Sequence, residues 1–377
     1  MSWRIEQGDC LSALQSFDAG SVQTCVTSPP YWGLRDYGTA EWEGGDAECD
    51  HLRGSLVSQR SGLRNDGRAH AGPYEGEQNI STGMPYAEVC GKCGATRKDS
   101  QLGLEPTPEQ YVENMVKVFR EVRRVLRDDA TLWLNLGDSY ANPGHYKGNP
   151  GDHGTIGRPR QADQETAETR YRKEFGGLKN KDLCGIPWRV AFALQADGWY
   201  LRSDIIWAKP NPMPESVTDR PTRSHEYIFL LTKSARYFYD AEAVREDAIW
   251  AGDSRAGQGH IDYDGKRDGQ PGQGQRAFVS ISAGRNKRSV WTVTTQPYKE
   301  AHFATFPPKL IEPCVLAGSA RDDTVLDPFC GAGTTGVVAL RHDRDFIGIE
   351  LNPEYCELAR ERIRQDGPLF NVASEAA

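Results

Sequence analysis

The stretch TVLDPFCGAGTTGVVAL, residues 324–340, decides the fold class of this chain. It combines a short apolar strand over Thr324–Leu326, a glycine-rich turn and a helix over Thr335–Leu340. A further strand over Phe346–Glu350 and a further helix over Pro353–Arg364 follow. Because strands that alternate with helices build parallel sheets covered on both faces, we predict an α/β fold with a doubly wound, mostly parallel sheet.

Earlier parts of the chain add elements of the same two kinds, separated by polar segments. The segments 33–104, 140–181 and 240–288 are glycine-rich and poor in apolar periodicity, and the first reads as an insertion. The predicted elements are the helices Cys10–Gln15, Pro108–Leu126, Pro187–Ala196 and Pro308–Ala317, a strand that begins at Arg4, and the strands Val22–Thr27, Thr131–Leu136, Ser203–Trp207 and Tyr227–Thr232.

The composition of the 377-residue chain indicates a soluble, cytoplasmic protein. Hydrophobic residues make up 38%, and no apolar run is long enough to span a bilayer. The residues after Met1 lack the charged and then apolar pattern of a leader peptide. Nine cysteines, an odd number scattered over a long chain, indicate reduced thiols rather than a disulfide framework.

The net charge of −8 argues against a protein that coats nucleic acid through bulk charge, because such binding needs clustered Lys and Arg. A local basic patch lies between Arg276 and Lys299, where the sequence has no acidic residue. We predict that Arg276, Arg285, Lys287 and Arg288 contact DNA phosphates or guanine edges, the alternative being a solvated basic face.

The turn GAGTTG, residues 331–336, follows a strand and opens a helix, and Glu350 ends the next strand. Glycines let the backbone approach a ligand, and a helix N-terminus favours an anionic group. The spacing matches the dinucleotide fingerprint, so an NAD-dependent oxidoreductase is one interpretation. Only about 40 residues follow Gly336, too few for the remaining strands of such a domain unless the chain order is permuted.

The sequence SPPY, residues 28–31, suits chemistry at an exocyclic amino group of a base. The lone pair of that nitrogen is delocalised into the ring, which makes the nitrogen a poor nucleophile. The Ser28 hydroxyl and the Pro29 carbonyl can accept its two N–H bonds and hold it pyramidal, while Pro30 fixes the direction of the loop. Tyr31 can stack on an extruded base. The simpler alternative is a loop with proline punctuation and a buried aromatic residue.

The two motifs DPFCGAG, residues 327–333, and TSPPYW, residues 27–32, together resemble the signature pair of amino-group DNA methyltransferases. The resemblance covers most of the chain, and the order of the motifs is that of the β class. It implies a circularly permuted class I methyltransferase fold with a seven-stranded sheet, S-adenosylmethionine as cofactor, and base flipping from double-stranded DNA in a bacterial or phage-infected cell. A non-catalytic DNA-binding module on the same fold is the remaining alternative.

The resemblance also implies roles for individual residues. Phe329, Gly331 and Gly333 would border the methionine portion of the cofactor, Glu350 would bind the ribose hydroxyls, and Asp9 would face the adenine amino group. The expected cofactor-binding set is Asp9, Cys10, His302, Phe306, Asp327, Phe329, Gly331, Gly333, Thr334, Thr335, Glu350 and Asn352.

The residue type at position 28, a serine, helps to predict which base is the target. Among the enzymes that the chain resembles, Ser at this position is more frequent in N4-cytosine enzymes and Asp in N6-adenine enzymes. A serine cannot act as a carboxylate base, so positioning of the amino group has to carry the reaction, with proton loss after transfer. We expect cytosine N4 as the target and adenine N6 as the alternative.

The insertion carries a separate pattern, Cys49-x-His51 together with Cys90-x-x-Cys93. Three thiolates and one imidazole suit a closed tetrahedral zinc site. Because the insertion has few apolar residues, we expect a structural zinc ion that clips it together near the DNA. Unlinked surface cysteines or a redox pair are the alternatives.

These observations divide the chain into four parts. Residues 1–32 and 105–239 form the catalytic part, residues 33–104 the zinc-clipped insertion, residues 240–290 the target-recognition segment, and residues 291–377 the cofactor-binding part. A homodimer is one assembly that the sequence leaves open.

Overall fold

The structure is a computed structural model, in which residues 1–33, 39–53, 84–85, 89–141, 177–247, 284–296 and 305–366 form the described part of the chain. The expected cofactor residue His302 and the expected DNA contact Arg276 lie outside these residues, as does most of the segment 240–288. Within the described part, no helix is long and apolar enough to cross a membrane.

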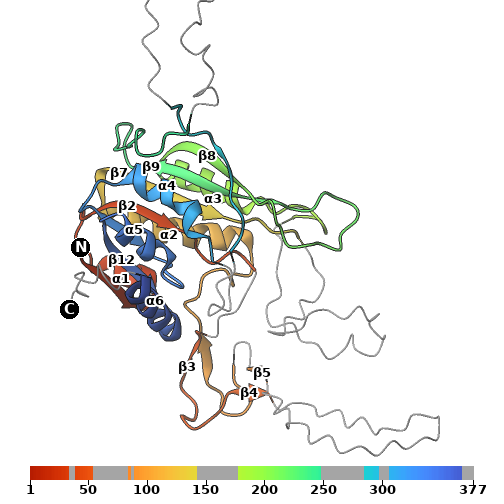
Figure 1. The fold of residues 1–377 in the computed structure, drawn as a ribbon. Coiled ribbons are helices and arrows are strands. Elements are labelled where there is room, and N and C mark those ends of the chain that lie inside the picture. Colours follow the sequence, from red (N-terminus) through yellow and green to blue (C-terminus); the bar gives the residue numbers. More distant parts are fainter. Residues whose placement is uncertain are drawn as a thin grey trace, which may run out of the picture.

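Within the described residues, one eight-stranded sheet organises the fold (Figure 1). Seven strands run in one direction, and β9 is antiparallel to both of its neighbours. The prediction of a mostly parallel sheet is therefore confirmed. In spatial order the strands are β1 (Trp3–Gln7), β12 (Asp345–Glu350), β11 (Thr324–Asp327), β2 (Val22–Thr27), β7 (Leu126–Leu136), β9 (His225–Thr232), β8 (Tyr200–Ala208) and β10 (Val290–Thr292).

The expected number of seven strands is wrong for this sheet, because β10 adds an eighth at the edge. Val290 pairs with Ile206 and Thr292 with Ala208. This strand has three residues inside a polar stretch, so it gives no apolar run that sequence periodicity could detect. At the other edge β1 pairs with β12, so the N-terminal residues complete the C-terminal half of the sheet.

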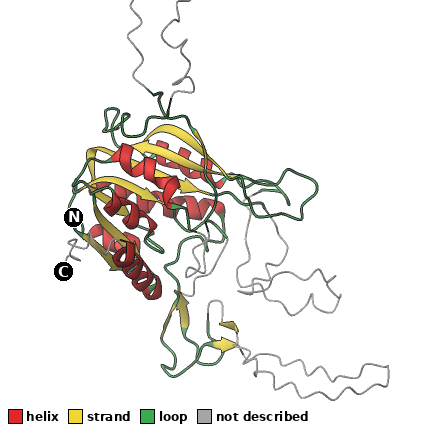
Figure 2. Cartoon of the chain, viewed as in Figure 1, coloured by secondary structure: helices red, strands yellow, loops and turns green. Residues whose placement is uncertain are grey.

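Helices cover both faces of the sheet (Figure 2). The helices α1 (Cys10–Gln15), α2 (Pro108–Val125) and α3 (Ile186–Ala196) contribute to one buried apolar cluster. The helices α4 (Pro308–Gly318), α5 (Thr334–Arg341) and α6 (Pro353–Asp366) contribute to the other. Two cores on opposite faces are the mark of the doubly wound arrangement that the alternating pattern predicted.

Local sequence explains why these elements form where they do. In α2 the side chain of Thr107 accepts a hydrogen bond from the amide of Gln110 at 3.2 Å, and Pro108 occupies the first turn. Met115, Phe119 and others at helical spacing are buried. All six residues of β2 are buried, as expected for a central parallel strand.

The described parts of the insertion stand out from the main sheet as small antiparallel pairs (Figure 1). The strand β3 (Glu41–Glu43) pairs with β6 (Thr96–Lys98). The strand β4 (Leu52–Arg53) pairs with β5 (Met84–Pro85). After β6 the chain returns to the main body through residues 99–107 and enters α2.

Candidate active site

Two neighbouring parallel strands, β2 and β11, bring the two sequence motifs together. Val325 lies opposite Thr24, and Leu326 lies opposite Cys25. Because parallel strands end at the same edge of a sheet, the loops that follow them meet there. The Thr27 hydroxyl at the end of β2 donates a hydrogen bond to Asp327 at 2.6 Å, across 300 residues of sequence.

Asp327 is a buried support for both loops. Its carboxylate also accepts hydrogen bonds from the Thr335 hydroxyl at 2.6 Å and from the Phe329 amide at 3.1 Å. Burial raises the pKa of Asp327 to about 6, against the opposing effect of the two hydroxyl donors. Asp327 and Thr335 are buried and bonded to each other, and their contact with the cofactor stays a prediction.

The glycine-rich loop after β11 turns sharply toward the end of β12. Gly331 and Gly333 have φ values of 51° and 74°, a region that side chains disfavour. A Cβ on Gly333 would lie 3.0 Å from Ala359 Cβ. The Gly331 amide donates to Glu350 Oε2 at 2.9 Å, and the Asn352 amide donates to Glu350 Oε1 at 2.8 Å. Burial raises the pKa of Glu350.

The structure also places four other residues that are expected to bind the cofactor, Phe306, Phe329, Thr334 and Asn352. Phe329 is partly buried against the core on the α2 side, and Phe306 against the core on the α4 side. The Thr334 hydroxyl accepts a hydrogen bond from Arg362 at 2.9 Å. The side chain of Asn352 accepts the Glu354 amide at 2.8 Å, so it also caps the start of α6.

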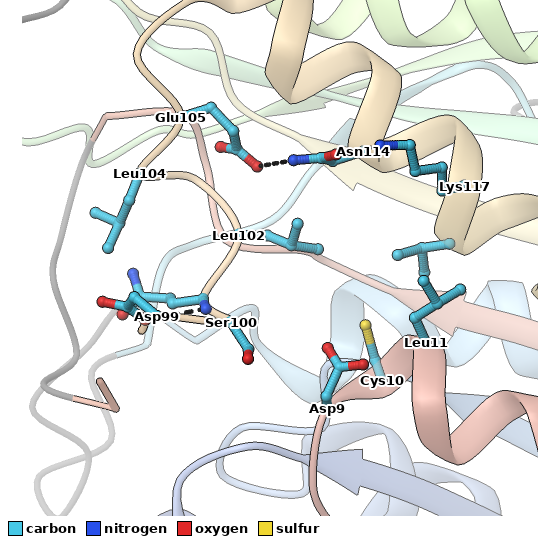
Figure 3. Close-up of a pocket in the computed structure, with 12 residues that line it drawn as sticks. Asp9, Cys10, Leu11, Asp99, Ser100, Leu102, Leu104, Glu105, Asn114 and Lys117 are labelled. Atoms are coloured by element: carbon cyan, nitrogen blue, oxygen red, sulfur yellow. Dashed lines mark hydrogen bonds between the residues drawn. The ribbon is translucent and has the colours of Figure 1, made fainter. Parts of the chain in front are cut away.

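A pocket of about 520 Å³ opens beside the end of β1 (Figure 3). Asp9 and Cys10 line it at the start of α1, and Glu105 and Lys117 line it from the side of α2. Asp9 accepts the Ser12 amide at 2.9 Å. Burial, with the nearby Asp9 charge, raises the pKa of Cys10 to about 12, so this thiol stays protonated.

The SPPY loop is held by hydrogen bonds and close packing from residues that were not predicted to belong to the site. The Pro30 carbonyl accepts a hydrogen bond from the Tyr111 hydroxyl at 2.9 Å. The Trp32 indole donates to the Glu105 carbonyl at 2.8 Å. Gly103 has a φ of 93°, and a Cβ there would lie 2.9 Å from the Tyr31 carbonyl oxygen. The backbone of residues 103–105 therefore packs directly against the SPPY loop.

Tyr31 is held by a polar network. Its hydroxyl lies 2.8 Å from Glu226 Oε2 and 3.2 Å from Asn135 Oδ1. A phenol has one proton to donate, and the shorter bond to a charged acceptor favours Glu226. The Ser28 hydroxyl lies 3.3 Å from the Tyr31 oxygen, and Lys209 forms an ion pair with Glu226. Burial first, and then Glu226, raises the pKa of Tyr31 well above its ordinary value.

Sequence reasoning missed Asn135, Lys209 and Glu226, although a signal was present for two of them. Asn135 is a polar residue in an apolar strand, and Glu226 stands at the start of another one. Because β9 is antiparallel, its first residues lie at the edge where the parallel strands end. The direction of β9 is a property of the sheet, and the local sequence does not carry it.

The four expected metal ligands come together in the insertion. The ligand atoms of Cys49, His51, Cys90 and Cys93 all lie within 4.8 Å of one another.

The described basic residues of the expected recognition segment contact other side chains of the chain. Arg285 and Arg288 form ion pairs with Glu246 at 3.1 and 3.0 Å. The Lys287 ammonium lies 5.0 Å from the centre of the Trp291 ring, in a cation–π contact.

Comparison with known proteins places these features among similar sequences. The family described as DNA methylase, of the N6/N4 type, matches residues 22–361. The type II methyltransferase M.Cfr9I of Citrobacter freundii is 41% identical over 373 residues, which cover 98% of this chain and 90% of that protein. M.SmaI of Serratia marcescens is 41% identical over 362 residues, which cover 96% and 91%.

Among solved structures, PvuII DNA methyltransferase (cytosine-N4-specific) is similar with a TM-score of 0.52 and 16% sequence identity. The similarity covers 100% of this chain and 94% of that chain. At this level of identity the likeness shows a shared fold.

Proposed function

The chain belongs to the N6/N4 DNA methylase family, and we propose that it transfers a methyl group from S-adenosylmethionine to the N4 amino group of cytosine in double-stranded DNA. One observation carries the proposal. The SPPY loop and the glycine-rich loop follow neighbouring parallel strands and are joined by the bond between Thr27 and Asp327. A cofactor on the second loop and a base at the first would lie side by side.

The side chains around the glycine-rich loop fit S-adenosylmethionine. Each Glu350 oxygen accepts one amide, and a carboxylate oxygen has a second lone pair, so both retain capacity for ribose hydroxyls. The start of α5 favours the carboxylate of the methionine portion, and Gly331 and Gly333 allow close approach. Asp9 and Cys10 on the pocket wall suit the adenine. When bound, the cofactor supplies an electrophilic methyl group on a positively charged sulfur.

The chain's own residues orient the base. In our proposal the cytosine leaves the duplex stack, because its amino group is paired inside the helix. The Ser28 hydroxyl and the Pro29 carbonyl accept the two amino N–H bonds and direct the nitrogen lone pair at the methyl group. Once methylated, the nitrogen would carry a positive charge and would release one of its protons to solvent water, while the electron pair of the broken sulfur–carbon bond would stay on sulfur. Tyr31, fixed by Glu226 and packed over Gly137, supports the base at this position.

Ser28 is the ground for choosing cytosine over adenine, as in the enzymes that the motif resembles. The chain order, with the SPPY loop before the glycine-rich loop, supports a circularly permuted arrangement. We assign residues 1–32 and 105–239 to catalysis, residues 33–104 to an insertion with a zinc site, residues 240–290 to target recognition, and residues 291–377 to cofactor binding. Arg285, Lys287 and Arg288 then lie on the DNA side.

The decisive experiment incubates the chain with S-adenosylmethionine carrying a labelled methyl group and with duplex DNA of mixed sequence, followed by mass spectrometry of the nucleosides. We expect labelled N4-methylcytosine. Labelled N6-methyladenine would overturn the choice of base, and the absence of label would overturn the proposed activity. Protection against heating by S-adenosylmethionine and not by NAD is expected in the same preparation.

The two ends of β2 supply a matched pair of variants. Ser28→Ala removes the proposed acceptor and should lower the rate of methyl transfer by about 100-fold. Ser21→Ala removes an exposed hydroxyl that donates to the Asp18 carbonyl at 2.8 Å at the opposite end of the strand, and should leave the rate unchanged. Equal rates in both variants would refute the role of Ser28.

A further inference from the structure

We propose that Cys49, His51, Cys90 and Cys93 bind one zinc ion, and that this ion holds the segment 95–105 under the SPPY loop. The first half of the proposal is independent of the proposed function, and the second half rests on it.

The distances in the cluster are those of tetrahedral coordination. Bonds of about 2.3 Å from zinc to sulfur and about 2.05 Å from zinc to nitrogen set two sulfurs about 3.8 Å apart and a sulfur and a nitrogen about 3.6 Å apart. The sulfurs of Cys49 and Cys90 are 3.7 Å apart. The Cys93 sulfur lies 3.5 Å from His51 Nδ1. The same distances are far too long for a disulfide, whose sulfurs lie about 2.05 Å apart.

Backbone amides point at the sulfurs, as they do around metal-bound thiolates. The Lys92 amide donates to the Cys90 sulfur at 3.4 Å. The amides of Asp46 and Ala95 donate to the Cys93 sulfur. These donors stabilise negative charge on sulfur, the form in which cysteine binds a metal.

Two further contacts fix the geometry of the ligands. Gly45 has a φ of 72°, and a Cβ there would lie 2.7 Å from the Cys93 sulfur, so the turn before Cys49 packs closely on the other half of the site. The Trp42 ring stacks on the His51 ring with centroids 4.5 Å apart and an angle of 14° between the planes. The imidazole is therefore held in one orientation.

The cluster is continuous with the catalytic loop. Ala95, next to Gly45 and Cys93, is fully buried, and β6 follows directly. Asp99 pairs with Arg97 at 3.0 Å, where the Arg97 side chain is only 4% exposed. Four residues later, the Gly103 carbonyl accepts the amide of Gly33 at 2.6 Å, beside the SPPY loop. The ion would thus anchor the far end of the support under Tyr31.

Apart from the four ligands, the described residues of the insertion provide little packing that could hold the segment 95–105 in place. Its two strand pairs contain two or three residues per strand, and the side chains of β3 and β6 are exposed or half-buried. Strand pairs this short are marginal in water without a covering core. A metal clip can supply the missing stability, since the free energy of metal binding becomes free energy of folding.

The first test measures metal in the purified full-length chain by elemental analysis. We expect about one zinc per chain. Cys93→Ala should lower the content sharply, and Cys184→Ala, which removes a buried thiol elsewhere, should leave it unchanged. A folded, metal-free wild-type chain would refute the site.

A cobalt-exchanged wild-type chain keeps the test independent of whether the variants fold. Thiolate ligands should give charge-transfer absorption and tetrahedral cobalt should give strong visible bands. A weak spectrum of octahedral type would overturn the assignment.

The second half is tested by removing the metal with a chelator. We expect a change of tryptophan fluorescence that is smaller in Trp42→Phe than in the wild-type chain, because Trp42 stacks on His51. Methyl transfer should fall by about 100-fold, the effect of shifting reacting groups by about 1 Å. Loss of the ion with an unchanged rate would overturn the supporting role and leave the metal site standing. If the wild-type chain transfers no methyl group, the proposed function fails and the metal measurements still decide the site.

Discussion

At the scale of single residues, the Tyr31 hydroxyl joins the polar side chains of the site. The Tyr31 oxygen lies within hydrogen-bonding distance of Ser28, Asn135 and Glu226. Glu226 also pairs with Lys209, so its charge is compensated where it meets the phenol. This network fixes the aromatic ring next to the proposed base site without placing a carboxylate on the amino group itself.

Two variants of this tyrosine separate its ring from its hydroxyl. Tyr31→Phe keeps the ring over Gly137 and loses one hydrogen bond to a charged group, so methyl transfer should fall by about 10-fold. Tyr31→Ala also removes the ring, and its rate of methyl transfer should fall by about 1000-fold. Tyr200→Phe on β8, 48% exposed, is the control and should match wild type in single-turnover assays. Equal losses in the two Tyr31 variants would show that the ring is not used.

At the scale of elements, the position of the SPPY loop depends on what lies beneath it. The start of α2 supplies the Tyr111 hydroxyl to the Pro30 carbonyl, and the preceding turn places Gly103 against Tyr31. A loop that follows a strand has many orientations available, and these contacts select one.

Gly103→Ala tests this support. Gly103 has a φ of 93°, and a Cβ added there would lie 2.9 Å from the Tyr31 carbonyl oxygen, so the SPPY loop has to shift. We expect a loss of about 1 kcal/mol in stability and a fall of about 100-fold in methyl transfer.

Gly198→Ala is the matched control, with a φ of 101° and the nearest atom, Arg123 Nη2, at 3.9 Å. It should show the same loss of stability by denaturant unfolding and normal turnover. If turnover falls equally in both variants, the effect of Gly103 is general destabilisation.

At the scale of the whole molecule, the fold buries the carboxyl group of Asp327 at the edge where the parallel strands end. Asp327 sits below the two loops with a pKa raised to about 6 by burial. Its ordinary value is 3.8. The folded state thus holds this proton more tightly than the unfolded state, so the stabilisation is complete below about pH 4 and is lost as the pH rises through 6.

Unfolding by denaturant at pH 4 and pH 7 measures this effect in wild type and Asp327→Asn. The difference in stability between the two proteins should change by about 2 kcal/mol over that range, with wild type losing more at pH 7. Asp128→Asn, at a side chain 93% exposed on β7, should run parallel to wild type. Parallel curves for Asp327→Asn would contradict the raised pKa.

Much of the fold could be predicted because the patterns that specify helices and strands involve residues that are close together in the sequence. The pattern that predicts the helix Pro108–Leu126 lies within one segment, and the structure confirms this helix as α2, Pro108–Val125. The short strand β10 gave no such pattern and was missed. The ligand set of the proposed zinc site was predicted from two spacings, and the structure brings its four residues together.

The sequence by itself determined the motifs, the alternation of strands and helices, and the residue types at the proposed base and cofactor sites. Only the tertiary structure decided which residues surround Tyr31. Glu226 lies 195 residues from Tyr31 in the sequence and reaches its hydroxyl because β9, which runs antiparallel, begins at the edge where the parallel strands end. Gly103 lies under the loop because the chain returns from the insertion at that point. Local periodicity specifies each element, whereas the order and direction of the strands are set by packing between distant segments.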